Sequence, residues 1–210
     1  MKKMFSTLAV FTAAIVSLTA AEVIQLPAPD KTGGKPLMQA LTERQTNRDF
    51  KKDALALQDI SNLFYAACGI NRADSGKLTI PTALNMQNLI VYAAMESGLY
   101  RYDAKKNQLI PVKDADLRGY TFMRKEMPLS APLVMIYTAD ISKGRDADST
   151  LMMSNAHAGS AYQNVYLYCA SKGLSVVICG GFDKKVLAKQ MGITDRQAVL
   201  YTQIIGWPAK

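Results

Sequence analysis

The sequence predicts an α+β fold, in which a small mixed sheet lies under several helices. Three observations support this class. Helical patterns alternate with short apolar strand patterns along the 210 residues. The strands are too few for a doubly wound sheet, and a turn at Gly98 joins two of them as an antiparallel hairpin. Apolar residues make up 49% and charged residues 20%, which excludes a disordered or fibrous chain.

The first segment, residues 1–21, has the pattern of a cleavable signal peptide. Lys2 and Lys3 precede an uncharged apolar run, and small residues follow it. The run is short for a membrane span of about 20 residues, and no stop-transfer charges follow it. The alternative to a cleaved signal peptide is an uncleaved N-terminal anchor. We therefore expect a periplasmic or secreted protein that begins near Ala21 or Glu22 and has no stable membrane insertion after cleavage.

The mature chain is predicted to be one domain, residues 36–210, preceded by an extended arm, residues 22–35, that is rich in Pro and Gly. Two helices come first. Pro36–Arg44 has a proline at its start, and a second helix runs from Leu57 to Ala67, with Gly69 as its stop. The polar stretch Asn71–Ile80 that follows is expected to be a loop.

The remaining chain supplies the strands and three more helices. Strands are predicted at Leu89–Met95, Leu99–Tyr102, Pro132–Ala139, Ser175–Cys179 and Val199–Ile205. Helices are predicted at Asp114–Met127, from Leu151 to Cys169 with an end at Gly173, and from Asp183, as the cap, through Met191.

Several chemistries can be excluded from the motifs. The sequence has no GxGxxG after a strand, no P-loop, no HExxH and no GxSxG. The single histidine, His157, is interpreted as a hydrogen-bonded interior or interface residue. The three cysteines have neither CxxC nor zinc spacing, so we expect small buried hydrophobes; a Cys169–Cys179 bridge stays open. The formal charge of +8 fits solubility or an anionic partner, but no nucleic-acid-binding motif is present.

The first candidate site is the segment Arg44-Gln45-Thr46-Asn47-Arg48, at the end of the first predicted helix. If the segment curls, two guanidinium groups and one hydroxyl can converge on a phosphate. The alternative is a solvated helix end, where cations also suit the helix dipole.

Two further segments have ordinary alternatives as well. The run from Pro81 to Asn88 carries amides and hydroxyls that suit the edge of a heteroaromatic ring, although capping before a strand also explains them. Gly180 and Gly181 end a strand, where glycines let a backbone approach a flat ligand closely. A tight strand-to-helix turn explains these glycines equally well.

Taken in series, these segments resemble the nitroreductase family of flavoproteins, over roughly Pro36 to Lys210. Matching residues stand in the family's R-x-S-x-R-x-F/Y, P-S-x-x-N-x-Q-P, G…QN…L…GL, GGF and G-[YW]-P patterns. These residues are Arg44, Thr46, Arg48, Phe50; Pro81, Thr82, Asn85, Gln87; Gly159, Gln163, Asn164, Leu167, Gly173, Leu174; Gly180, Gly181, Phe182; and Gly206, Trp207, Pro208. Both family serines are threonines here, and Asn88 replaces a proline. The stretch PTALNMQN…GLYRYD resembles the thiazoline/oxazoline oxidase branch.

The resemblance implies a mixed, largely antiparallel central sheet flanked by helices, in a homodimer that binds FMN non-covalently at its interface. The FMN phosphate would be held by Arg44, Thr46 and Arg48, and Lys210 alone remains of the family's basic tail. The partner subunit would bring Pro81, Thr82, Asn85 and Gln87 to the flavin. The backbone N–H of Gly180 or Gly181 would face flavin N5. No side chain need act as an acid or base, because the flavin carries the redox chemistry.

The function that the resemblance implies is an exported FMN-dependent oxidoreductase, which passes electrons to or from a small organic substrate such as a nitroaromatic or a quinone. NAD(P)H is the family's usual electron donor, but reduced nicotinamides are scarce outside the cytoplasm, so the donor stays open. One alternative is an exported flavin-binding or flavin-storage protein with little turnover. Another is an anion-binding module without flavin, which leaves Asn85 and Gly180 unexplained.

Overall fold

A seven-stranded sheet forms the centre of the computed structural model, which describes residues 22–209. The predicted signal peptide and Lys210 lie outside the described residues. The spatial order is β1-β6-β5-β4-β7-β9-β8, and every pairing among the described strands is antiparallel. The strands are β1 (Ile24–Gln25), β4 (Leu89–Met95), β5 (Gly98–Asp103), β6 (Gln108–Lys113), β7 (Leu133–Asp140), β8 (Ser175–Cys179) and β9 (Gln197–Gly206). The predicted α+β class with a largely antiparallel sheet flanked by helices is confirmed.

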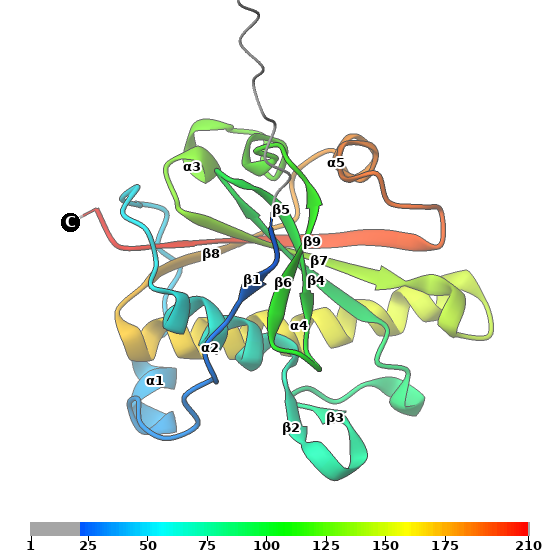
Figure 1. Cartoon of the computed structure of the whole chain (residues 1–210), viewed down its shortest axis with the longest axis horizontal. Helices are drawn as coiled ribbons and strands as arrows, with labels where there is room; N and C mark the ends of the chain where they lie inside the picture. Colours follow the sequence, from blue (N-terminus) through cyan, green and yellow to red (C-terminus); the bar gives the residue numbers. More distant parts are fainter. Residues whose placement is uncertain (1–21, 210) are drawn as a thin grey trace, which may run out of the picture.

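Helices cover both faces of this sheet (Figure 1). Helices α2 (Leu57–Cys68) and α4 (Ala147–Lys172) pack on one face, and α1 (Leu37–Glu43) packs against α4. The opposite face is covered by α5 (Lys184–Met191) and by the segment that includes the four-residue helix α3 (Glu126–Leu129). The central strands are therefore apolar on both sides, which explains the unbroken apolar run of β7.

Strand β7 shows how the pleat divides the core. Leu133, Met135 and Tyr137 point toward α2 and α4, whereas Val134 and Ile136 point toward α5. Successive side chains of a strand alternate between faces, so one strand contributes to both halves of the core.

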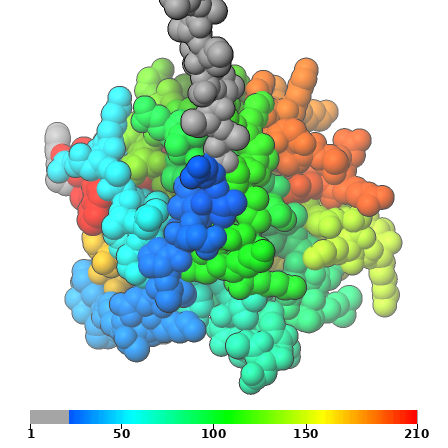
Figure 2. Space-filling model, viewed as in Figure 1, coloured from blue at the N-terminus to red at the C-terminus, as the bar shows by residue number. Residues whose placement is uncertain are grey.

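The arm, residues 22–35, lies on the surface beside α2 and β6 (Figure 2). Its strand β1 pairs with β6, and the Ser61 hydroxyl and the Asn62 side chain of α2 bond its backbone at Pro27 and Asp30. Among residues 22–209, no helix is both long and apolar enough to cross a bilayer.

Three local predictions are wrong or incomplete. The helix expected at Asp114–Met127 is an irregular segment with a 3-10 turn at Arg118–Tyr120. The Arg118 guanidinium binds both carboxylate oxygens of Asp116 and the carbonyl of Ala131, so side-chain hydrogen bonds replace a helical ladder there. Strands β1 and β6 were not predicted; Pro111 inside β6 obscures its pattern.

The expected loop Asn71–Ile80 contains a small hairpin. Its strands are β2 (Ile70–Arg72) and β3 (Lys77–Leu78), joined by a 3-10 turn over Ala73–Ser75. The helix end predicted at Gly173 is confirmed, and both Gly173 after α4 and Gly192 after α5 lie in the left-handed region.

All three cysteines are free and buried, as predicted, so no Cys169–Cys179 bridge is formed. Burial raises the pKa of Cys68 to about 12 and the pKa of Cys169 still further. These thiols stay protonated near neutral pH, so they act as small core residues and not as nucleophiles.

Candidate functional site

The segment 44–48 runs along the free edge of β8. Helix α1 ends at Glu43, and the extended backbone of Arg44 turns the chain toward the sheet. The Asn47 N–H donates to the Val176 carbonyl at 3.1 Å, which satisfies one acceptor of an edge strand. A bridge between Phe50 and Pro208 fixes the far end of the segment. The structure thus places the predicted phosphate-binding residues beside β8.

Tyr166 of α4 holds this segment in place. Its hydroxyl accepts a hydrogen bond from the Ile178 N–H at 3.0 Å and lies 3.1 Å from Thr46 Oγ1. The Arg44 guanidinium lies over the face of the same ring, 5.4 Å from its centroid, in a cation–π contact. Sequence reasoning missed Tyr166, whose only signal was a tyrosine next to the buried stripe of α4.

Arg48 lies at the other end of the segment, near the end of β8. Burial raises the pKa of the Cys179 thiol to about 11, and the positive charge of Arg48 partly offsets that rise. The side chains of Thr46 and Arg48 are exposed in the single chain. The exposed Thr46 and Arg48 and the half-buried Arg44 therefore lie beside the strand that leads into Gly180.

Nothing in the described chain requires glycine at positions 180 and 181. Neither residue has a positive φ. A Cβ on Gly180 would meet the Tyr201 ring at 3.7 Å, and one on Gly181 would meet Met123 at 3.7 Å, both ordinary van der Waals distances. Both glycines are exposed, so their backbone N–H groups are open to a molecule outside the chain.

The predicted flavin-binding residues of the 81–88 loop do not lie beside the segment 44–48. The loop contains a 3-10 turn, η2 (Ala83–Asn85), and packs on α4 at His157. His157 lies nine residues before Tyr166, which corresponds to about 13 Å along the helix. Within one chain the structure therefore does not bring Pro81, Thr82, Asn85 and Gln87 together with Arg44, Thr46 and Arg48.

The loop is closed by its own side chains. The Gln87 N–H donates to Thr82 Oγ1 at 3.2 Å, and Gln87 Nε2 donates to Asn85 Oδ1 at 3.1 Å. Leu84, Asn85 and Gln87 all have positive φ, between 44° and 54°. The predicted hydrogen-bonded interior role of His157 is confirmed, because its ring contacts both Asn88 and the Ala83 N–H.

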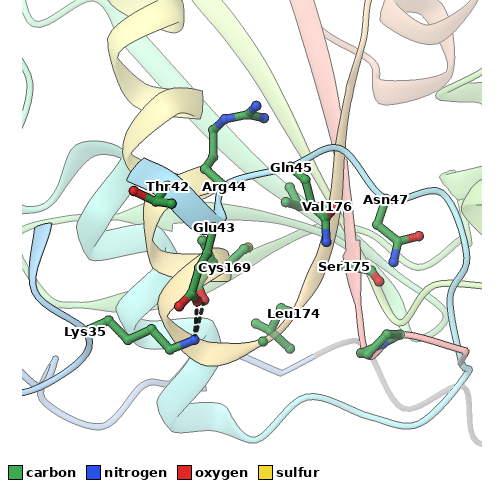
Figure 3. A pocket seen from close by; sticks show the side chains of 13 residues that line it. Lys35, Thr42, Glu43, Arg44, Gln45, Asn47, Cys169, Leu174, Ser175 and Val176 are labelled. Atoms are coloured by element: carbon green, nitrogen blue, oxygen red, sulfur yellow. Dashed lines mark hydrogen bonds and ion pairs between the residues drawn. The ribbon is translucent and has the colours of Figure 1, made fainter. Parts of the chain in front are cut away.

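A cavity of about 570 Å³ opens beside the 44–48 segment, between the end of α1, the end of α4 and β8 (Figure 3). Its lining includes Arg44, Asn47 and Ser175, and the ion pair of Lys35 with Glu43 closes one side. Ser175 Oγ is buried and has no hydrogen-bond partner among residues 22–209. The Arg44 side chain extends away from the Lys35–Glu43 pair (Figure 3).

Among the described residues, no three His, Cys, Asp or Glu side chains come together as a set of metal ligands. The chemistry that these residues can provide is anion binding by guanidinium and hydroxyl groups, beside a pair of open backbone donors.

The model of the nitroreductase family matches residues 41–207. A solved structure from Ralstonia eutropha, assigned as a nitroreductase, is 34% identical, with a TM-score of 0.84 over 91% of this chain and 92% of that one. A Methanocaldococcus jannaschii protein, also assigned as a nitroreductase, is 26% identical over 76% of this chain and 84% of its own.

A nitroreductase-assigned structure from Desulfovibrio desulfuricans, solved in complex with FMN, shares the fold at 16% identity, with a TM-score of 0.63 over 85% of this chain and 89% of that one. The family model covers most of the chain, including the segment 44–48, the 81–88 loop and the two glycines. The chain is a member of the nitroreductase family.

Proposed function

We propose that this nitroreductase-family oxidoreductase depends on FMN, which it uses to move electrons to or from a small organic substrate such as a nitroaromatic or a quinone. The observation that carries the proposal is the alignment of Arg44, Thr46 and Arg48 along β8, leading to two glycines that the chain's own packing does not require. This arrangement offers a cationic anion site and open N–H donors along one edge of the sheet.

Two groups of residues beside β8 fit FMN: the two arginines suit its phosphate, and the two glycines suit its ring system. A phosphate takes two or more charge-assisted hydrogen bonds best from arginine forks, and the segment has two arginines four residues apart. Gly180 and Gly181 lack side chains where a flat ring system would have to approach the backbone. The related D. desulfuricans structure holds FMN, which supports the same cofactor here.

In this site the protein positions groups and does not donate protons. FMN supplies the redox chemistry when it is bound. Arg44 and Arg48 would neutralise its phosphate, and Tyr166 fixes Thr46 and the stacked Arg44 guanidinium. The N–H of Gly180 or Gly181 would donate to the ring of a bound flavin. The Cys179 thiol remains protonated there because burial raises its pKa to about 11.

A homodimer would complete the site. Arg44, Thr46 and Arg48 form the proposed phosphate clamp. The 81–88 loop lies away from the clamp of its own chain, so its polar residues would reach the flavin of a partner subunit. Leu84 at the tip of the loop is 80% exposed and has a φ of 50°, an unusual conformation for an exposed leucine. Contact with a second copy would cover Leu84 and account for this conformation.

Titration of the mature chain with FMN tests the cofactor. We expect one FMN per subunit with micromolar or tighter affinity, because the clamp provides several charge-assisted hydrogen bonds. Absence of FMN binding at micromolar concentration would reject the proposal. Reduction of bound FMN by NADH or NADPH, followed by reoxidation by a quinone, separates an oxidoreductase from an exported flavin-storage protein, which would show little turnover. The resemblance to the thiazoline/oxazoline oxidase branch stays a prediction.

We also propose that the protein is exported, on the strength of the pattern in residues 1–21. The mass of the chain isolated from its native cells is expected to correspond to an N-terminus near Ala21 or Glu22. An intact Met1 on protein from the cytoplasmic fraction would contradict export and would favour NAD(P)H as the electron donor.

A further inference from the structure

His157 occupies a buried position between α4 and the 81–88 loop. Its Nε2 accepts a hydrogen bond from the Ala83 N–H at 2.8 Å, and its Nδ1 lies 3.0 Å from Asn88 Oδ1. Since Nε2 accepts, Nδ1 carries the ring hydrogen and donates it to Asn88. Asn88 is itself fixed, because its Nδ2 donates to Ser154 Oγ at 2.7 Å and to the Asp140 carbonyl at 3.3 Å.

The loop that His157 contacts is in an unfavourable backbone conformation. Leu84, Asn85 and Gln87 occupy the left-handed region, which costs free energy for residues other than glycine. Such conformations persist only where the surroundings determine them. The bond from the Ala83 N–H to His157 ties the start of this loop to α4, directly before the first left-handed residue, whereas Asn88 ties its end to Ser154 of the same helix.

We propose that neutral His157 is a positioning residue, which holds the 81–88 loop in the conformation that presents Thr82 and Asn85 to FMN, and that protonation of its ring releases the loop. The assignment of the loop to the flavin rests on the proposed function. The anchoring of the loop itself rests only on the contacts within the chain.

Protonation acts through the hydrogen-bond pattern. A second ring hydrogen would occupy Nε2, so two donors would face each other where Ala83 N–H now meets an acceptor. The cavity beside the ring is lined by Pro81, Met153, Ala156 and Ser160, and none of these residues carries a charge that could stabilise an imidazolium. Three cations and one carboxylate lie near the loop. Lys143 Nζ donates to the Gln87 carbonyl at 3.2 Å, and Arg72 and Lys77 line a cavity with Thr82 and Asn85, so none of these cations can stabilise an imidazolium. The Asp140 carboxylate accepts hydrogen bonds from the Ser142 N–H and hydroxyl.

Burial lowers the pKa of His157 below its usual value of 6.5. The folded protein therefore disfavours the protonated ring more than the unfolded chain does. The stability that this site contributes is complete above pH 6.5 and decreases as the pH falls below that value toward the lowered pKa.

Hydrogen exchange of the backbone amides of residues 82–88 in the FMN-free protein tests the anchor. For the wild type we expect exchange, corrected for its intrinsic pH dependence, to be roughly tenfold faster at about pH 5 than at about pH 7.5. His157→Gln keeps an acceptor for the Ala83 N–H and cannot titrate, so its loop should stay protected at both pH values. His157→Phe removes the acceptor, so its loop should exchange rapidly at both. Ser160→Ala, one turn away, serves as the control and should behave as the wild type does.

The rate of FMN dissociation, measured for the same variants, should follow the same pattern. Equal loss of loop protection in the wild type and His157→Gln at low pH would overturn the proposal, as would full protection in His157→Phe. If the exchange pattern holds but FMN dissociation does not follow it, the link from this loop to the flavin is wrong. If no variant binds FMN, the proposed cofactor is wrong, and the exchange data still decide the anchor.

Discussion

Replacement of Arg48 by alanine is expected to weaken FMN binding by roughly 10- to 150-fold and to leave riboflavin binding nearly unchanged. A hydrogen bond to a charged group contributes about 1.5–3 kcal/mol, and about 1.4 kcal/mol corresponds to a factor of ten. Riboflavin lacks the phosphate, so it cannot use that interaction. Titration of the two flavins by fluorescence quenching or calorimetry gives both affinities.

The neighbouring variants should rank in a defined order. Arg44→Ala is expected to match Arg48→Ala, and Thr46→Val should weaken FMN binding less, because a neutral hydroxyl donates a weaker hydrogen bond. Arg145→Ala removes an exposed arginine far along the chain and controls for the loss of net charge. If Arg48→Ala lowers FMN and riboflavin affinity equally, the arginine acts on the fold or on the ring pocket, and the phosphate assignment is wrong.

A heterodimer of two defective chains is expected to regain one tight FMN site. One chain carries Arg48→Ala, which damages the clamp, and the other carries Asn85→Gly, which removes the amide while glycine accepts the positive φ of that position. If each site combines the clamp of one chain with the loop of the other, one site of the heterodimer is intact and the other has both defects.

Co-expression with two different tags and tandem purification isolates this heterodimer. FMN titration should then show about one site of wild-type affinity per dimer, whereas both parent homodimers bind weakly. Weak binding throughout the heterodimer would mean that clamp and loop act within one chain, or that the loop does not touch the flavin. A monomer in sedimentation of the wild type would contradict the shared site outright.

The sequence predicts the parts of this fold whose side chains are buried by regular periodicity. The strands β4, β7 and β8 and most of β9 are apolar because helices cover both faces of the sheet, so their patterns are strong. The segment 114–131 could not be predicted in the same way. Its conformation depends on Arg118 bonding to Ala131, thirteen residues away, and local periodicity contains no trace of that contact.

In the candidate site, too, the sequence predicts some residues and not those whose role depends on contacts between distant segments. Arg44, Thr46, Arg48 and the two glycines are recognisable from residue type and spacing. Tyr166 is not, because its role comes from one hydroxyl that meets Thr46 and the Ile178 N–H, from segments 120 and 12 residues away. The sequence predicts that His157 is an interior residue. Its bond to the Ala83 N–H depends on the left-handed turn of the loop, and the residue types at positions 84–87 do not predict that turn.

The position of β9 in the sheet has a consequence for the time course of folding. β9 is the last strand along the chain, yet it lies between β7 and β8. Until residues 197–206 have been made and have left the ribosome or a secretion channel, β7 and β8 each lack a neighbour, and the two parts of the sheet stay unjoined. Pairing of β7 with β9 closes a loop of more than fifty residues, which is a slow, late event. A chain of this topology therefore completes its sheet only after nearly all of its residues have been made.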